Sequence, residues 1–222
     1  LTHTSGYVYD MWNADQRAWI KAHGVKREDI FGAVADRPPL AFDPGTRWQY
    51  GVGIDWAGKV LEAVTGEALN DYVQANICKP LGMASTGYLL TDALRARLAG
   101  VHQRGGDGAV KAVDFDPPQN PAHFNGGGGM YSTAPDYACF MRMMLNGGSL
   151  DGAQILKPET VALMGQNHIG DVLVEKLNSC MPHLTCDAEF YPGMAKKWGL
   201  TFMINQDDVP GARRAGSLAW AG

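Results

Sequence analysis

Residues 42–66, FDPGTRWQYGVGIDWAGKVLEAVTG, constrain the fold of this chain more than any other stretch. The Pro44-Gly45 step is typical of a tight turn. Apolar residues then recur at helical spacing over 54–65, and Gly66 is placed to end that helix in a left-handed conformation. Tyr50 is therefore predicted to lie between a turn and the start of a long amphipathic helix.

Helical patterns continue through the first two thirds of the chain. A second helix is expected over 69–77, and Thr133 and Asp136 have the spacing of a capping box ahead of a third. Residues 100–124 contain paired glycines and paired prolines, and they are expected to form a long connection of the kind that often lies near a binding site.

From residue 197 the pattern becomes that of strands. One strand is expected over 198–204, followed by a polar turn over 205–210 and a second strand over 213–222. Helices first and paired strands last predict an α+β fold with the sheet only begun. The predicted division is a mainly helical domain at 1–165, a loop-rich insertion at 166–195 and the first strands of an antiparallel sheet domain at 196–222.

Composition narrows the classes of partner. Lys plus Arg number 19 and Asp plus Glu number 23, giving a net charge of −4, and the basic residues form no cluster. This balance argues against nucleic acid as a partner. No apolar run approaches the roughly 20 residues that a membrane-spanning helix needs.

Several catalytic signatures are missing from the sequence. None of the six serines lies in a G-x-S-x-G elbow or precedes a lysine by three residues. The histidines form no H-E-x-x-H motif, and Gly126–Gly129 lacks the Lys-Ser/Thr of a phosphate-binding loop. We therefore expect neither a metal nor another cofactor.

The remaining histidines and cysteines have structural interpretations. His3 and His123 are expected to be structural histidines. Cys78 and Cys139 lie on apolar helical stretches and are expected to be buried thiols. Cys180 and Cys186 lie in a loop-like segment where a disulfide is an open alternative.

Seven phrases together resemble the serine beta-lactamase and penicillin-binding-protein-like hydrolases. Within these, they are most similar to the class C beta-lactamase-like esterases called family VIII carboxylesterases. The phrases are LTHTSG at 1–6, FDPGTRWQY at 42–50, VTG at 64–66, KPLGM at 79–83, NGGGGMYSTAPDYACFMRMMLNGG at 125–148, KWGL at 197–200 and GSLAWAG at 216–222. They occur in the family's order, so the resemblance implies a beta-lactamase/transpeptidase-like fold.

The resemblance implies an acyl-enzyme mechanism in which Tyr50 is the general base. The serine of an S-x-x-K box attacks a carbonyl, and its lysine helps to activate it. A phenol acts as a base near neutrality only if a nearby cation stabilises the phenolate. That box is expected upstream of Leu1, because both ends of the chain look cut, and the 222 residues alone are expected to be inactive. The alternative role for Tyr50 is packing ahead of a helix.

Val52 and Asp55, which both follow Tyr50 closely, suggest which branch of the family the chain resembles. Val52 stands where classical beta-lactamases carry Asn, and valine cannot donate an amide hydrogen bond to a substrate's acylamino group. Asp55 follows, as in the esterase branch, either to orient the site or to cap the helix.

Trp220, Ala221 and Gly222 stand where lactamases carry K-T-G on an edge strand. Trp220 would replace the cation that binds a substrate carboxylate, unless it is simply a core aromatic residue. An amide of Ala221 or Gly222 could donate to the oxyanion. Gly127 and Gly128 would support the site by close backbone approach, or would form only a turn.

The predicted function is therefore a serine hydrolase that cleaves short-chain carboxylic esters. The alternatives are a beta-lactamase or D-amino-acid peptidase, and a non-catalytic homologue that acts as a binding module. The expected partner is a small-molecule ester or beta-lactam. The compartment and the oligomeric state are left open.

Overall fold

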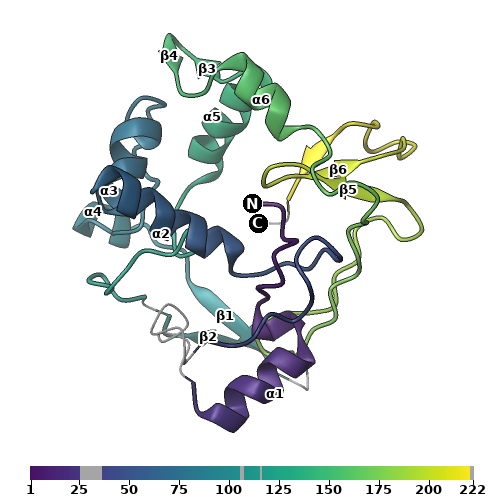
Figure 1. Ribbon diagram of the computed structural model, residues 1–222. Coiled ribbons are helices and arrows are strands. Elements are labelled where there is room, and N and C mark those ends of the chain that lie inside the picture. The colour runs from purple at the N-terminus through teal and green to yellow at the C-terminus, as the bar shows by residue number, and fades with distance from the viewer. Residues whose placement is uncertain (26–36, 106–107, 116, 221–222) are drawn as a thin grey trace. The chain divides into compact units, whose positions relative to one another are not determined.

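The computed structural model describes residues 1–25, 37–105, 108–115 and 117–220 (Figure 1). The chain divides into two compact units. Unit 1 joins Leu1–Ile54 to Leu163–Gly222, and unit 2 is Asp55–Ala162. The sequence-based division at residues 165 and 195 follows chain order and stays a prediction.

Unit 1 contains a short helical region and an antiparallel sheet. Its first elements are η1 (Asp10–Trp12) and α1 (Ala14–His23), and its strands are β5 (Lys196–Trp198), β6 (Met203–Asn205) and β7 (Leu218–Ala219). The strand order is β5-β6-β7, with all neighbours antiparallel. Figure 1 shows β5 and β6 side by side.

The register of this sheet places large side chains on one face. Trp198 is opposite Met203, which is opposite Ala219. Trp198 and Met203 are almost completely buried and pack against Trp48 from the segment before α2. The core of unit 1 thus joins the sheet to the residues that precede Tyr50.

The single strand expected over 198–204 is wrong. Gly199 donates to the carbonyl of Phe202 at 2.7 Å, so a tight turn separates β5 from β6. Thr201 has φ +71°, which is unusual for a β-branched residue. A Cβ on Gly199 would lie 2.1 Å from the carbonyl oxygen of Met164, a contact with a distant segment that strand propensity does not reveal.

The second expected strand, over 213–222, is also shorter than predicted. Among the described residues, only Leu218 and Ala219 form β7. Gly216, with φ +76°, turns the chain just before β7, and its amide donates to Asn205 at 2.8 Å. The strand therefore begins only at Leu218, after the turn at Gly216.

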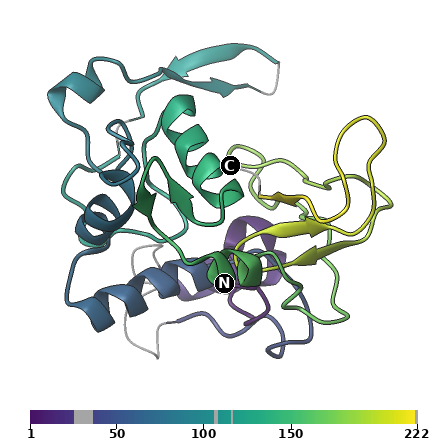
Figure 2. The ribbon, with the colours of Figure 1, turned by 90° about the horizontal axis from the view of Figure 1, so that it is seen from above.

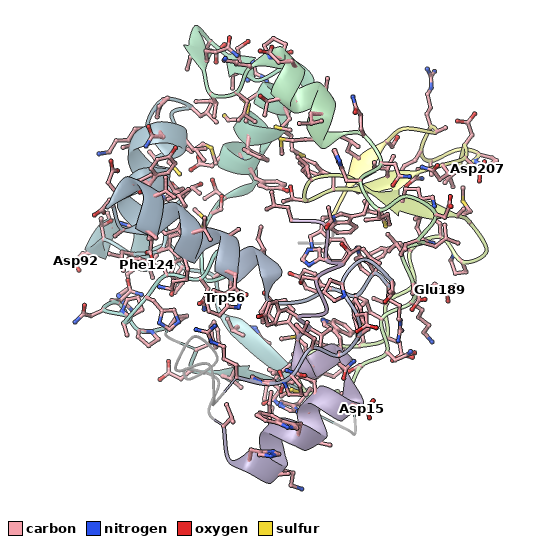
Figure 3. The ribbon with its side chains drawn as sticks, in the orientation of Figure 1. Asp15, Trp56, Asp92, Phe124, Glu189 and Asp207 are labelled. Carbon is pink, nitrogen blue, oxygen red and sulfur yellow. The ribbon has the colours of Figure 1, made fainter. Side chains whose placement is uncertain are left out.

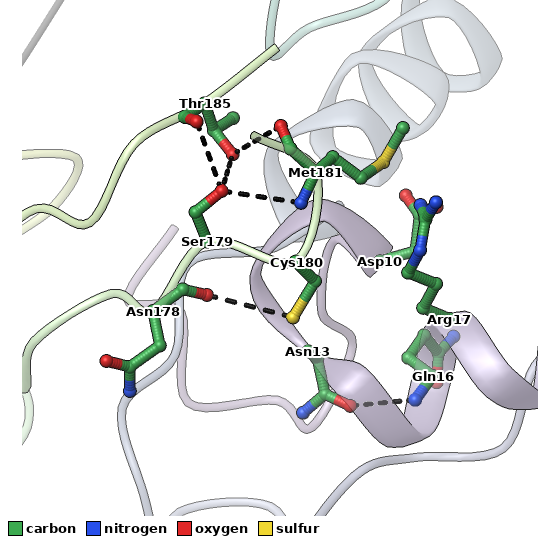
Figure 4. Close-up of polar contacts among 9 residues, drawn as sticks. All are labelled: Asp10, Asn13, Gln16, Arg17, Asn178, Ser179, Cys180, Met181 and Thr185. Carbon is green, nitrogen blue, oxygen red and sulfur yellow. Dashed lines mark hydrogen bonds and ion pairs between the residues drawn. The ribbon is translucent and has the colours of Figure 1, made fainter. Parts of the chain in front are cut away.

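The segment around Cys180 is fixed by short polar contacts (Figure 4). Ser179 Oγ lies 2.6 Å from Thr185 Oγ1, and the amide of Cys180 donates to the carbonyl of Met11 at 2.8 Å. Cys180 is half-buried and Cys186 exposed, and both are free thiols. The disulfide alternative is therefore not formed here.

Unit 2 is mainly helical. Most of α2 (Gly53–Thr65) belongs to it, followed by α3 (Leu69–Val73), the π-helical turn η4 (Gln74–Cys78), α4 (Asp92–Arg95) and α5 (Ala134–Leu145). The short hairpin β3 (Ser149–Leu150) and β4 (Ala153–Gln154) precedes α6 (Pro158–Met164). Cys78, Leu81, Met83, Met143 and Leu150 form the buried core of unit 2.

The helix ends of unit 2 confirm the cap expected at Thr133 and the stop expected at Gly66. The capping box is only half formed, because the Asp136 carboxylate accepts the Ser85 amide at 2.8 Å and the Thr86 hydroxyl at 2.9 Å. Thr133 Oγ1 accepts the amide of Asp136 at 3.4 Å at the start of α5. Gly66 ends α2 with φ +73°. Both features depend on the residue at the helix end and its near neighbours, so they can be predicted from the sequence.

The irregular connection expected over 100–124 is wrong in its first half. Strands β1 (Val101–Arg104) and β2 (Val110–Val113) pair as an antiparallel hairpin (Figure 2). Nearly all its side chains are exposed, so it lacks the apolar alternation that identifies a half-buried strand. In the part of the chain that the structure describes, no helix has the length and apolar character to cross a bilayer.

Candidate active site

Tyr50 lies in unit 1, three residues before α2, with aromatic rings on several sides. Its ring centroid is 4.9 Å from that of His3, 5.0 Å from Tyr9 and 4.8 Å from Trp220. The amide of Tyr9 donates to the carbonyl of Tyr50 at 3.4 Å. The predicted base is therefore a half-buried phenol packed against three aromatic rings.

Trp220 approaches Tyr50 from the end of β7. Besides its contact with Tyr50, its ring centroid lies 4.7 Å from that of Trp198. The structure thus brings together Tyr50 and Trp220, two of the predicted site residues. Ala221 and Gly222, the predicted oxyanion donors, lie outside the described residues.

Val52 occupies the position two residues after Tyr50 and is buried, with 6% of its surface exposed. The preceding Gly51 lies very close to the segment that contains Tyr7. A Cβ on Gly51 would lie 2.0 Å from the carbonyl oxygen of Tyr7. The path of the chain after Tyr50 is therefore closely packed, and Val52 presents an apolar side chain without a hydrogen-bond donor.

Asp55 and the glycine-rich segment form a second group, within unit 2. Asp55 is buried in the first turn of α2, and its Oδ1 accepts the amide of Gly127 at 2.8 Å. Figure 3 labels Trp56, the next residue of α2. Tyr88 Oη donates to the carbonyl of Asn125 at 2.7 Å. Hydrogen bonds thus hold this segment at two points.

The backbone of the glycine-rich segment also packs against α2. A Cβ on Gly58 of α2 would lie 3.4 Å from the Cα of Gly126, and Gly129 has φ +94°. Gly128, in contrast, has open space where a Cβ would lie. Gly126 thus packs against α2 at about ordinary contact distance, and the supporting role expected of Gly127 and Gly128 stays a prediction.

Burial affects two titratable groups near these residues. It lowers the pKa of His3 to about 3, so the imidazole is neutral near neutrality. It also raises the pKa of Tyr88 to about 12, an effect to which the negative charge of Asp55 adds. Because His3 is neutral, it does not supply the cation that a Tyr50 phenolate would need.

His3 is buried and hydrogen-bonded, as expected of a structural histidine, but the sequence did not predict its contact with Tyr50. The available signal was its place in the LTHTSG phrase. Within the described ranges, no group of three or more His, Cys, Asp or Glu side chains is arranged to hold a metal ion.

Comparison with known proteins gives a consistent result. The family model described as Beta-lactamase matches residues 1–222. Monacolin J acid methylbutanoyltransferase of Aspergillus terreus is 32% identical over 100% of this chain and 55% of its own length. Lovastatin esterase of Penicillium rubens is 29% identical, over 100% of this chain and 57% of its own.

A solved structure gives a similar match. The LovD9 mutant of simvastatin synthase (LovD) from Aspergillus terreus aligns with a TM-score of 0.77 and 31% identity, over 100% of this chain and 56% of that one. The chain thus spans about half the length of the curated relatives it matches.

Proposed function

This chain belongs to the beta-lactamase family, and we propose that it contributes Tyr50 as general base to a serine hydrolase that cleaves carboxylic esters. None of its six serines precedes a lysine by three residues, so the nucleophile and its lysine would come from outside these 222 residues. The observation that carries the proposal is the contact between Tyr50 and Trp220, which puts two of the family's motif positions side by side.

In the first half of the reaction, the Tyr50 phenolate takes the proton of the serine hydroxyl as serine Oγ bonds to the ester carbonyl carbon. The lysine ammonium would stabilise the phenolate. The ester C–O bond then breaks, and the alcohol leaves with the proton held by Tyr50. The acyl group remains on the serine.

In the second half, water attacks the acyl-enzyme and gives its proton to Tyr50. The carboxylic acid is released as that proton returns to serine. Amides of Ala221 or Gly222 would stabilise the oxyanion in both halves.

Neutral esters are the favoured substrates because of Val52 and Trp220. Neither side chain offers an amide or a positive charge to the acylamino and carboxylate groups of a beta-lactam. A second candidate is acyl transfer, in which an alcohol replaces water as the acceptor. The 32% identity to a methylbutanoyltransferase favours this candidate.

The test uses the whole native polypeptide that contains these residues. We expect p-nitrophenyl butyrate to be hydrolysed faster than nitrocefin, and Tyr50→Phe to lower kcat about 100-fold or more, the usual contribution of a general base. The matched control, Tyr137→Phe on the exposed face of α5, should retain full activity.

Other outcomes would replace this proposal. Faster turnover of nitrocefin would favour a beta-lactamase, and absence of both turnover and fluorophosphonate labelling would favour a binding module. Preferential formation of a new ester when a primary alcohol is added would favour the acyltransferase. For the 222 residues alone, we expect no fluorophosphonate labelling.

A further inference from the structure

We propose that His3 is a positioning residue that sets the orientation of Tyr50 by bonding to the backbone on both sides of it. The carbonyl of His3 accepts the amide of Gln49 at 2.9 Å. Its ring Nδ1 accepts the amide of Gly51 at 3.3 Å. A single residue thus binds the amides of both neighbours of Tyr50, which belong to the Trp48–Gln49 and Tyr50–Gly51 peptide units. The catalytic part of this inference rests on the proposed role of Tyr50.

The backbone of His3 adopts the conformation that allows both bonds. Its φ is +56°, in the left-handed region that is unfavourable for a residue other than glycine. Such strain persists only where surrounding contacts over-determine the conformation, and it clusters at functional sites. At His3 the two hydrogen bonds to the Tyr50 segment provide those contacts.

The ring of His3 is itself held in place. It is 6% exposed and meets the rings of Trp48 and Trp198 edge-on, with centroids 6.1 Å and 5.2 Å away. Because Trp48 and Trp198 belong to the buried core of unit 1, the ring has little freedom to turn. Its contact with Tyr50 is therefore part of a rigid aromatic cluster.

The chemistry of the ring agrees with a positioning role. Nδ1 can accept the Gly51 amide only in the neutral imidazole, whose proton must then lie on Nε2. Burial favours the same neutral form. His3 therefore neither supplies a positive charge to Tyr50 nor takes its proton, and it acts through the backbone.

This arrangement matters because the phenolic oxygen lies at the far end of the Tyr50 side chain. A small rotation of the backbone at Tyr50 moves that oxygen more than it moves Cα. Small misplacements of a reacting group can lower a rate about 100-fold. The two bonds from His3 limit this rotation.

Two variants of His3 test the bond from its ring to Gly51 while the bond from its carbonyl to Gln49 is kept, and a third variant is the control. His3→Gly keeps the carbonyl and adopts the left-handed conformation freely, but it removes the acceptor for Gly51. His3→Asn tolerates the same φ and places an amide oxygen near the position of Nδ1. His23→Asn is the matched control, since His23 lies exposed at the end of α1.

Amide hydrogen exchange in the whole native polypeptide tests the structural half of the proposal. The Gly51 amide should be protected in the wild type and in His3→Asn, and exchange at least tenfold faster in His3→Gly. Nitrogen shifts of the wild-type His3 ring should report a proton on Nε2 and no titration between pH 5 and 8. Titration within that range would overturn the proposal without any variant.

Kinetics of the whole native polypeptide test the catalytic half. Here His3→Gly should lower kcat for p-nitrophenyl butyrate about 10- to 100-fold with KM nearly unchanged, because the base is misplaced and substrate binding is not. His3→Asn should recover most of kcat. A merely structural role would lower the amount of folded protein and leave kcat per folded molecule unchanged.

The outcomes distinguish this inference from the proposed function. If Tyr50→Phe is inactive but folded His3→Gly has full kcat, the inference on His3 fails and the function stands. If Tyr50→Phe keeps full activity, the proposed function is wrong, and the catalytic half of the inference, which rests on it, is wrong as well. If His3→Gly does not fold, a folded His3→Asn that keeps full kcat although its Gly51 amide is unprotected would overturn the inference.

Discussion

The side chain of Asp55 accepts a 2.8 Å hydrogen bond from the amide of Gly127, which lies 72 residues later in the chain. The bond joins the first turn of α2 to the glycine-rich segment. Asp55 is 5% exposed, so water cannot readily replace it as the acceptor. The bond is partly buried, and an amide that loses its partner there is left at least partly unsatisfied, at a cost in desolvation.

We therefore expect Asp55→Ala to lower the free energy of unfolding by about 1–3 kcal/mol. Asp55→Asn keeps an oxygen acceptor and should lose less. Urea unfolding followed by circular dichroism measures both. The exposed Asp114→Ala is the control, and equal midpoints for all three variants would contradict the importance of this bond.

Gly51 gives a sharper prediction about the segment after Tyr50. A Cβ there would lie 2.0 Å from the carbonyl oxygen of Tyr7 and 2.5 Å from the Cα of Val8. Because both obstacles are backbone atoms, Gly51→Ala should lose about 3 kcal/mol of stability, at the upper end for overpacking. Thermal unfolding measures this loss. Gly128→Ala, where the Cβ meets open space, should unfold within a few degrees of the wild type.

Features that depend on neighbouring residues could be predicted from the sequence. Thr133 caps α5 and Gly66 ends α2, both as expected, because a hydroxyl at the cap and a glycine with positive φ act locally. The α+β class and the beta-lactamase-like fold are also confirmed. Motif order carried that assignment.

Features that depend on distant contacts could not be predicted. The turn at Gly199 leaves no room for a Cβ because the carbonyl of Met164 lies close by, and the hairpin of β1 and β2 is too exposed to show an apolar pattern. For the candidate site, motifs indicated Tyr50 and Trp220, whose catalytic roles stay predictions. The bonds from His3 depend on a positive φ at a non-glycine residue and on contacts more than 40 residues away.

Lys196 provides a test of what stabilises residues 190–194, the segment before β5. Its buried ammonium group donates to the carbonyls of Phe190, Tyr191 and Met194, the last at 3.0 Å. Lys196→Met keeps the apolar stem but leaves these carbonyls without their donor, so we expect a loss of about 1–3 kcal/mol. Denaturant unfolding measures it.

Lys197 is the comparison for Lys196. It also donates to carbonyls, those of Gly170 and Val172 at 2.8 Å and 2.9 Å, but from a more exposed position. Water can solvate those carbonyls once the ammonium group is removed. Lys197→Met should therefore cost less than Lys196→Met, and the reverse order would contradict this account.

The low pKa of His3 predicts a specific loss of stability in acid. Above about pH 6.5 the imidazole is neutral in both the folded and the unfolded chain. As the pH falls from 6.5 towards the folded pKa of about 3, the unfolded chain binds a proton that the folded chain does not. The free energy of unfolding then falls by up to about 1.4 kcal/mol per pH unit from this group.

Urea unfolding between pH 7 and pH 4 measures this effect. His3→Asn removes the titrating group, so its stability should fall less steeply than that of the wild type. His23→Asn should fall as steeply as the wild type. Identical slopes for His3→Asn and the wild type would show that His3 is not buried in the neutral form.

Trp220 provides the test of substrate class. Trp220→Lys places an ammonium group where the resemblance implies a substrate carboxylate would bind, and a charged hydrogen bond is worth about 1.5–3 kcal/mol. In the whole native polypeptide, the ratio of kcat/KM for nitrocefin to that for p-nitrophenyl butyrate should rise about tenfold or more. Both absolute rates should fall, because the substitution also removes the ring packed 4.8 Å from Tyr50.

Trp220→Met separates the charge from the lost ring. It also removes the aromatic contact with Tyr50 but adds no cation, so both rates should fall while their ratio stays close to that of the wild type. If the ratio rises equally in both variants, the space left by the ring, and not the charge, controls access of the beta-lactam. Trp220 would then act as a steric barrier, and the preference for neutral esters would have to be assigned to Val52.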